Sequence, residues 1–432
     1  MVSRNEADLV RTVESGTTKN VSPRPAIFFG ILLLSLTILA WPRILEEFVS
    51  LDWRLGNMRP VAYGLQFVLG VLTVATALGR NWANSKFHKL FPSGKRFIFA
   101  AVAFLFSLAL TVVAAEGLLR LLHIPFQAKW SLSEDALARF DPELGWSYIP
   151  DRSVTQEFGD EHRPVPMYFD TLGCRVRQPG LRADPSAPTI LFVGDSFTFG
   201  HGVTYEESFV GRLASRPDFP WQVVNLGVQG YGTDQALLLL KRQFKKFNTK
   251  VVVYTFMALH VDRNQIYDVR IIRPHALWLS TKPLFALKPD GTLYLAKTPV
   301  EYKDFSYSRL RACLEIFDDR WGPKPSVRLT RTLVEEMKEY VESNGAKFLA
   351  VDWNQWGPEK KRPLFREGDF PWGLDVDVVR PGVDPPAGWL TWIIPGDSHP
   401  DPRAHLYVSE LVAKELQRIM SDQGTIASAG AF

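Results

Sequence analysis

The most constraining feature of this 432-residue sequence is a short apolar run that ends at a glycine. Residues 189–193 read TILFV, and Gly194, Asp195 and Ser196 follow directly. An apolar run of this length, bounded by turn residues, predicts a strand that is buried on both faces. Ser196 then lies on a turn at the carboxyl end of that strand, the edge where open α/β sheets place ligands and catalytic groups. We expect the carboxylate of Asp195 to brace this turn.

A serine hydroxyl becomes an effective nucleophile only when a base takes its proton and a third group orients that base. Near the end of the chain, Asp397 and His399 stand two residues apart. The order Ser, Asp, His points to Ser196 as nucleophile, His399 as general base and Asp397 as the orienting carboxylate. Plainer interpretations remain: Ser196 as a turn serine and His399 as a loop histidine bonded to backbone. His405 is a competing base, which we place on the outer helix in a structural role.

The rest of this region alternates between predicted strands and helices. Strands are predicted over 221–226, 250–256 and 347–351, and helices over 204–214, from Thr233, over 326–344 and over 403–420. Strands that alternate with helices in this way predict a parallel sheet.

These segments resemble the blocks of the SGNH (GDSL-type) hydrolase superfamily, in a membrane-anchored bacterial form. The first block of that family is a strand followed by Gly-Asp-Ser, as at 194–196, and its second block has a glycine that Gly230 matches. Its last block pairs Asp and His before a proline, as Asp397 and His399 do here. The resemblance covers about residues 188–420 and implies a flavodoxin-like, doubly wound sheet of about five parallel strands. It also implies ester hydrolysis or acyl transfer without a cofactor.

The sequence departs from the family pattern in two places. The usual Asp-x-x-His is shortened to Asp-x-His, which changes how Asp397 reaches the imidazole of His399. The third block usually supplies an asparagine to the oxyanion hole, and Leu259 takes its place. Two functions therefore stay open. One is a serine esterase or O-acyltransferase that acts on an acylated envelope carbohydrate or glycolipid. The other is a weakened SGNH fold kept as a binding or scaffolding subunit of an envelope polysaccharide assembly.

An oxyanion hole needs N–H donors directed at the developing negative charge. The backbone N–H groups of Ser196 and Gly230 are available whatever their side chains. Either His260 or Asn264 supplies the missing side-chain donor, with His260 slightly favoured because it is nearer the strand end, or the site is weaker. Pairing of His260 with Asp262 is the alternative. No metal is expected, because the histidines and carboxylates show no paired ligand spacing.

Apolar residues crowd the first 125 positions. Three runs, over 26–41, 61–78 and 97–115, are separated by short polar loops. Each run approaches the roughly 20 residues that a membrane-spanning helix needs, and three of them argue for an anchor rather than a cleaved signal peptide. Burial of these helices inside a soluble domain is the alternative.

Lysine and arginine in the loops predict the orientation of this anchor. The loop 79–96 carries five basic residues without an acid, and the tail 1–25 carries four basic residues. The loop 42–60 carries three arginines balanced by three acids. Tail and second loop are therefore expected inside, in a multi-pass protein of the cytoplasmic (inner) membrane. Everything after about residue 125 then lies on the outer, periplasmic side.

The predicted fold class is α/β, with three N-terminal transmembrane helices before the SGNH-like doubly wound domain. The parts are a cytoplasmic tail (1–25), the anchor (26–125), a lead-in segment (126–187) and the hydrolase-like domain (188–425). Within that domain, an insertion around 265–325 is expected to hold a hairpin, and a Trp-rich loop spans 353–392.

The amino-acid composition limits the classes of partner that the chain is expected to bind. The net charge of +4 is too mild to indicate nucleic acid binding. Cys174 and Cys313 are interpreted as two separate thiols, with a disulfide between them as the alternative if the domain is exported. Five tryptophans precede the last block, where aromatic faces suit stacking on a sugar or, alternatively, packing of the loop itself. They are Trp353, Trp356, Trp372, Trp389 and Trp392.

Overall fold

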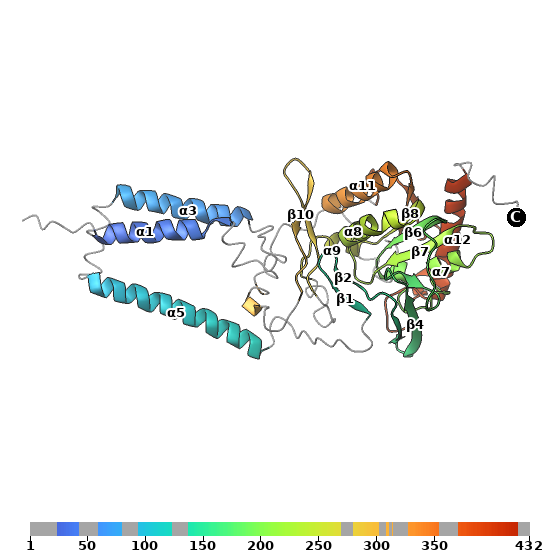
Figure 1. Ribbon diagram of the computed structural model, residues 1–432, viewed down its shortest axis with the longest axis horizontal. Coiled ribbons are helices and arrows are strands. Elements are labelled where there is room, and N and C mark those ends of the chain that lie inside the picture. The colour runs from blue at the N-terminus through green and yellow to red at the C-terminus, as the bar shows by residue number, and fades with distance from the viewer. Residues whose placement is uncertain are drawn as a thin grey trace, which may run out of the picture. The chain divides into compact units, whose positions relative to one another are not determined.

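The computed structural model divides near residue 118 into two compact units, an N-terminal helical unit and a unit that holds a sheet (Figure 1). It describes residues 24–42, 59–79, 94–122, 137–268, 280–301, 308–310, 313, 327–353 and 370–421. The tail 1–25 therefore lies almost wholly outside the described residues.

The N-terminal unit contains helices where the three apolar runs predicted them. They are α1 (Arg24–Leu39), α3 (Arg59–Leu78) and α5 (Gly94–Leu121). Helices α1 and α3 pack together, with the hydroxyl oxygens of Thr37 and Thr73 3.4 Å apart. Among the described residues, the part of α5 from Phe97 to Leu121 is the one helix long and apolar enough to cross a membrane, with a mean hydropathy of 2.6. The apolar parts of α1 and α3 are shorter.

The second unit is built on an eight-stranded sheet with the order β12-β11-β8-β6-β7-β5-β4-β3. Its strands are β3 (Ser153–Phe158), β4 (Arg163–Phe169), β5 (Arg175–Val176), β6 (Pro188–Gly194), β7 (Gln222–Gly227), β8 (Asn248–Phe256), β11 (Lys347–Asp352) and β12 (Asp377–Val379). The five strands from β12 to β7 run parallel, as predicted. Strand β6 is central, and the next two strands along the chain pair on its opposite sides. A ligand site is expected where the strand order reverses in this way.

The segment predicted only as a lead-in extends the sheet with three antiparallel strands. Two prolines, Pro164 and Pro166, made β4 look unlike a strand. The backbone N–H of Phe169 donates to Arg152 on the β3 side, so odd-numbered residues of β4 face β3. The prolines alternate with them and point away, so no ladder donor towards β3 is lost.

Helices cover both faces of the sheet (Figure 1). They are α7 (Phe209–Ala214) and α12 (Pro402–Ser421) on one face, and α8 (Thr233–Gln243) and α11 (Val327–Ser343) on the other. The side chains of β6 alternate between the two cores: Phe192 packs with α7 and α12, and Leu191 with α8 and α11. A strand buried on both faces reads as a continuous apolar run for this reason.

Helix α7 begins later than predicted. Thr204 and Glu207 do form the reciprocal bonds of a capping box, at 2.9 and 3.3 Å. The helix nevertheless begins at Phe209, and Ser208 accepts from its first turn. Arg163 binds the Glu207 carboxylate at 2.7 Å, which holds this segment as a turn against β4.

Smaller elements complete the domain. They are the hairpins β1 (Ala138–Asp141) with β2 (Gly145–Tyr148) and β9 (Leu284–Leu287) with β10 (Leu293–Lys297), the short helices α6 (Ser196–Phe199) and α9 (Leu259–Arg263), and the 3₁₀ turns Phe244–Lys246 and Trp389–Thr391. The second hairpin lies where the insertion was expected to hold one.

His405 lies on α12 in a structural position, as expected. It is fully buried, its ring stacks on Phe209, and its Nδ1 accepts the Phe209 N–H at 3.2 Å. Burial, helped by the positive charge of Arg175, lowers the pKa of His405 to about 3. The folded protein therefore keeps this imidazole neutral where the unfolded chain would protonate it.

We predict that His405 makes the fold acid-sensitive. The contribution of the neutral His405 to the free energy of unfolding is fully present above the ordinary histidine pKa of 6.5. It is lost as the pH falls towards 3. In that window the free energy of unfolding should fall by about 1 kcal/mol per pH unit from this group. His405→Asn keeps an acceptor without the titration, so it should be less stable at pH 8 but show a flatter profile in denaturant titrations between pH 7 and 4. The exposed His162 is the control, and parallel profiles for wild type and His405→Asn would contradict the prediction.

Candidate active site

A sharp turn after β6 positions Ser196. Gly194 has φ +153°, and a Cβ there would lie 2.4 Å from the Thr198 hydroxyl, so only glycine fits. The Asp195 carboxylate accepts the N–H of Phe197 at 3.0 Å and caps α6. Ser196 becomes the first residue of that helix, where a backbone N–H has no acceptor within the helix.

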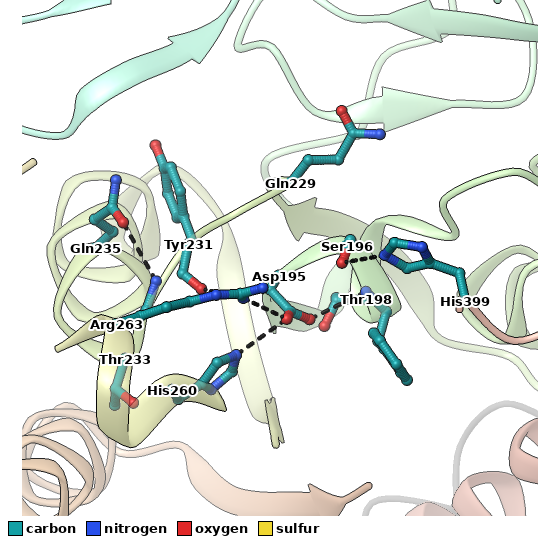
Figure 2. A network of polar contacts seen from close by, with 12 residues as sticks. Asp195, Ser196, Thr198, Gln229, Tyr231, Thr233, Gln235, His260, Arg263 and His399 are labelled. Carbon is teal, nitrogen blue, oxygen red and sulfur yellow. Dashed lines mark hydrogen bonds and ion pairs between the residues drawn. The ribbon is translucent and has the colours of Figure 1, made fainter. Parts of the chain in front are cut away.

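The other oxygen of Asp195 is the centre of a buried network (Figure 2). Asp195 has no exposed surface, and its Oδ2 lies 2.8 Å from a guanidinium nitrogen of Arg263 and 3.2 Å from Nε2 of His260. Burial would raise the pKa of Asp195, but His260, Arg263 and the Phe197 N–H outweigh it and lower the pKa, so the carboxylate stays ionised. Arg263 also donates to the Tyr231 carbonyl at 2.9 Å, which ties the serine turn to the loop after β7.

The three residues predicted as nucleophile, base and orienting acid meet at one point. His399 Nε2 lies 2.9 Å from Ser196 Oγ, and His399 Nδ1 lies 2.5 Å from Asp397 Oδ1. A carboxylate can only accept, so Nδ1 carries the proton and Nε2 is left to accept from the serine hydroxyl. Ser196 is 5% exposed and His399 9%, so the pair is largely shielded from water.

The shortened Asp-x-His spacing works because Asp397 turns back on its own loop. Its Oδ1 accepts the backbone N–H of His399 at 3.0 Å, the bond of an Asx turn. The same oxygen then meets Nδ1 of the same residue. Backbone pairing of Ile394 with His399, at 3.0 Å, closes this loop.

The remaining oxygen of Asp397 contacts a histidine that the sequence prediction missed. His201 Nε2 lies 3.1 Å from Asp397 Oδ2, and its Nδ1 lies 2.6 Å from the Gln229 amide nitrogen. Burial would raise the pKa of Asp397, but the bonds from His201 and His399 lower it. His201 and Gln229 follow the neighbouring strands β6 and β7, so their meeting becomes visible only once the strand order is known.

His201, Asp397 and His399 also have potential metal-ligand atoms within 4.8 Å of one another. Every one of these side chains is engaged in the hydrogen bonds just described. We therefore interpret the group as a hydrogen-bonded chain, and the expected absence of a metal stays a prediction.

Gly230 lies at the sheet edge beside the serine turn. Strands β6 and β7 pair with Gly194 opposite Gly227, and the Val228 N–H donates to the Gly194 carbonyl at 3.1 Å. Gly230 has φ +82°, a left-handed conformation that glycine adopts without strain.

The two side chains expected to complete the oxyanion hole are used elsewhere, and that prediction is corrected. His260 is fully buried between Asp195 and the Tyr254 hydroxyl, which lies 2.9 Å from its Nδ1. Burial lowers the pKa of His260, against the opposing effect of the Asp195 carboxylate. Asn264 donates both amide hydrogens to threonine hydroxyls, at 3.0 and 2.8 Å. Leu259 is 38% exposed at the start of α9.

Two of the tryptophans considered for sugar stacking are core residues. Trp353 and Trp389 are 2% and 3% exposed and stack on each other, and Trp353 also packs edge-on against Phe197. Trp392 is half-buried beneath the Arg403 guanidinium, and Trp356 lies outside the described residues. The packing alternative therefore holds for Trp353 and Trp389.

A scan against protein-family models found no match for the chain, and neither did a search of curated proteins. Solved structures similar to it include TesA, with 16% sequence identity and a TM-score of 0.32 over 54% of this chain and 99% of that one. The psychrotrophic esterase EstA from Pseudoalteromonas sp., inhibited by monoethylphosphonate, has 13% identity and a TM-score of 0.33 over 54% and 98%. A proposed lipolytic protein of the G-D-S-L family from Desulfitobacterium hafniense has 15% identity and a TM-score of 0.29 over 52% and 98%. Likenesses this weak carry no argument, and the proposals below rest on the residues themselves.

Arg175 is a further residue whose role the sequence did not reveal. Its buried guanidinium donates to the carbonyl oxygens of Phe199, Gly200 and Val203 at 2.6 to 2.7 Å. Burial lowers the pKa of Arg175 to about 10, so it remains a cation at neutral pH. These carbonyls belong to the end of α6 and the segment after it, so Arg175 holds the loop that carries His201.

We predict that Arg175→Met destabilises the protein by about 2–5 kcal/mol, because three buried carbonyl groups lose their donor. Arg177→Met changes an exposed arginine two residues away and should stay within about 0.5 kcal/mol of wild type. Chemical denaturation of the full chain measures both. Equal stability of the two variants would show that Arg175 does not hold this loop.

Proposed function

We propose that this chain is a serine-dependent esterase or O-acyltransferase that acts through an acyl-enzyme at Ser196. The observation that carries the proposal is the hydrogen-bonded series from Ser196 Oγ through His399 to Asp397. The series has the geometry and the proton placement that activate a serine nucleophile.

The first half of the proposed reaction forms the acyl-enzyme. Ser196 Oγ attacks the ester carbonyl carbon while its proton moves to His399 Nε2. The negatively charged oxygen of the tetrahedral intermediate is stabilised by the backbone N–H groups of Ser196 and Gly230. Collapse of the intermediate breaks the ester C–O bond, and His399 returns the proton to the leaving alkoxide.

The second half distinguishes a hydrolase from a transferase. His399 takes a proton from water or from a sugar hydroxyl, whose oxygen attacks the acyl carbon. The Ser196 ester bond then breaks, and His399 returns the proton to Oγ. Both reactions use the same groups, so the identity of the acceptor decides between them.

The proposed substrate is an acylated carbohydrate or glycolipid of the cell envelope. The apolar helices α1, α3 and α5 support this location, because they present large exposed hydrophobic side chains such as Phe67, Phe99 and Phe104. The basic loop 79–96 supports an orientation that leaves the sheet domain on the periplasmic side of the cytoplasmic membrane.

A binding or scaffolding subunit of an envelope polysaccharide assembly is the second candidate. One observation favours it: His260 and Asn264 do not replace the block asparagine, so two backbone donors must serve the oxyanion. Loss of one donor typically costs on the order of 100- to 1,000-fold in rate.

We predict that a fluorophosphonate probe labels the wild-type full chain in mild detergent and does not label Ser196→Ala. Phosphonylation needs a serine whose proton is accepted, so His399→Ala should label about 1,000-fold more slowly. Ser398→Ala is the matched control, because this exposed serine stands between Asp397 and His399, and it should label like wild type.

Equal labelling of wild type and Ser196→Ala would remove Ser196 from the mechanism. The scaffold would be favoured if the folded chain neither reacted with the probe, nor hydrolysed p-nitrophenyl acetate, nor transferred acetyl to an envelope glycan.

We predict that alkaline phosphatase fused after residue 126 is active in intact cells, because three spans carry this point to the periplasm. The same reporter fused after residue 90, within the basic loop, should be inactive. Activity after residue 90 and none after residue 126 would reverse the proposed topology.

A further inference from the structure

His201 occupies a defined place beside the proposed catalytic groups. Its ring centroid is 4.0 Å from that of His399, and Phe158 packs edge-on against it at 4.6 Å. The His201 side chain is 19% exposed, and it also makes the hydrogen bonds to Asp397 and Gln229.

The hydrogen bonds determine which nitrogen of His201 carries a proton. Nε2 faces the Asp397 carboxylate, which only accepts, so Nε2 bears the hydrogen. Nδ1 faces the amide nitrogen of Gln229, which donates to it. His201 is therefore a neutral donor to Asp397 with its tautomer set by Gln229.

Asp397 thus receives a donor on each carboxylate oxygen: His399 on Oδ1 and His201 on Oδ2. A carboxylate held at one oxygen alone can rotate about its side-chain bond and lose the short contact to His399. The donor on Oδ2 prevents this rotation. This restraint matters here because the shortened loop places Asp397 only two residues before the histidine it must orient.

We propose that His201 is a positioning residue for the reaction: it fixes the Asp397 carboxylate so that Asp397 holds His399 towards Ser196. The chain Gln229–His201–Asp397–His399–Ser196 acts as one hydrogen-bonded unit. The inference rests on the proposed esterase function, and its test separates failure of the one from failure of the other.

The test compares side chains of different reach in the full chain, with p-nitrophenyl acetate as substrate. His201→Asn ends one bond too short to meet Asp397, whereas the amide nitrogen of His201→Gln can take the place of Nε2. His201→Asn should lower kcat about 10- to 100-fold with KM within about two-fold, and His201→Gln should recover most of the loss. His201→Phe keeps the ring packing without the donor and should resemble His201→Asn.

A double-mutant cycle with Asp397→Asn separates positioning from general support of the fold. In the Asp397→Asn background, removing the His201 donor should lower kcat by less than about three-fold, because the two residues act as a unit. Equal losses in both backgrounds, or a wild-type kcat in His201→Asn and His201→Phe, would overturn the inference. The same comparison made on fluorophosphonate labelling rates reports on Ser196 directly. A wild type that neither labels, nor hydrolyses the ester, nor transfers acetyl to an envelope glycan refutes the proposed function, and this inference with it.

Discussion

The site depends on one buried negative charge, the carboxylate of Asp195. Moving a carboxylate out of water costs several kcal/mol unless donors replace the water. Here the Phe197 N–H and a guanidinium N–H of Arg263 provide them, and His260 Nε2 lies 3.2 Å from the same carboxylate. Arg263 also donates to the Tyr231 carbonyl. The residue that neutralises Asp195 therefore connects the serine turn to the loop after β7, which contains Gly230. The two backbone segments proposed to hold the oxyanion are therefore fixed together.

The serine turn and the loop after β7 can be connected in this way because their strands are parallel. Strands β6 and β7 end at the same edge of the sheet, with β8 on the other side of β6, so three loops converge where the strand order reverses. The loop before α12 then brings His399 to the same edge from about 200 residues away in the sequence, and His405 packs α12 against Phe209. Arg175 holds the segment between α6 and α7 from the antiparallel side of the sheet.

The sequence predicted those parts that depend on local patterns or on a motif. The run at 189–193 gave the central strand because a strand buried on both faces must be apolar throughout. Ser196, Asp397 and His399 were recognisable because activation of a serine nucleophile needs those residue types, and the structure brings them within hydrogen-bonding distance. Strand β4 was not predicted because prolines such as Pro164 and Pro166 are untypical of strands. The strand forms nevertheless, because a proline lacks a donor only on the side that its nitrogen faces.

The errors arose where nearness along the chain was taken for nearness to the site. His260 follows the end of β8, but the first turn of α9 directs it to Asp195 and exposes Leu259 instead. His201 carried no motif, and its role depends on Gln229 in the loop after a neighbouring strand, which no local pattern shows. For Trp353 the sequence left sugar stacking and packing open, and the aromatic rings around it make it part of the core.

The central claim is that Ser196 carries the acyl group during turnover. The full chain can be mixed with p-nitrophenyl acetate, quenched in acid within the steady state and digested for peptide mass spectrometry. Acetyl is expected on the peptide that contains Ser196, at the serine oxygen, and none at the matching position in Ser196→Ala. Hydrolysis that proceeds with the acetyl group on another residue, or with none on the protein, would contradict it.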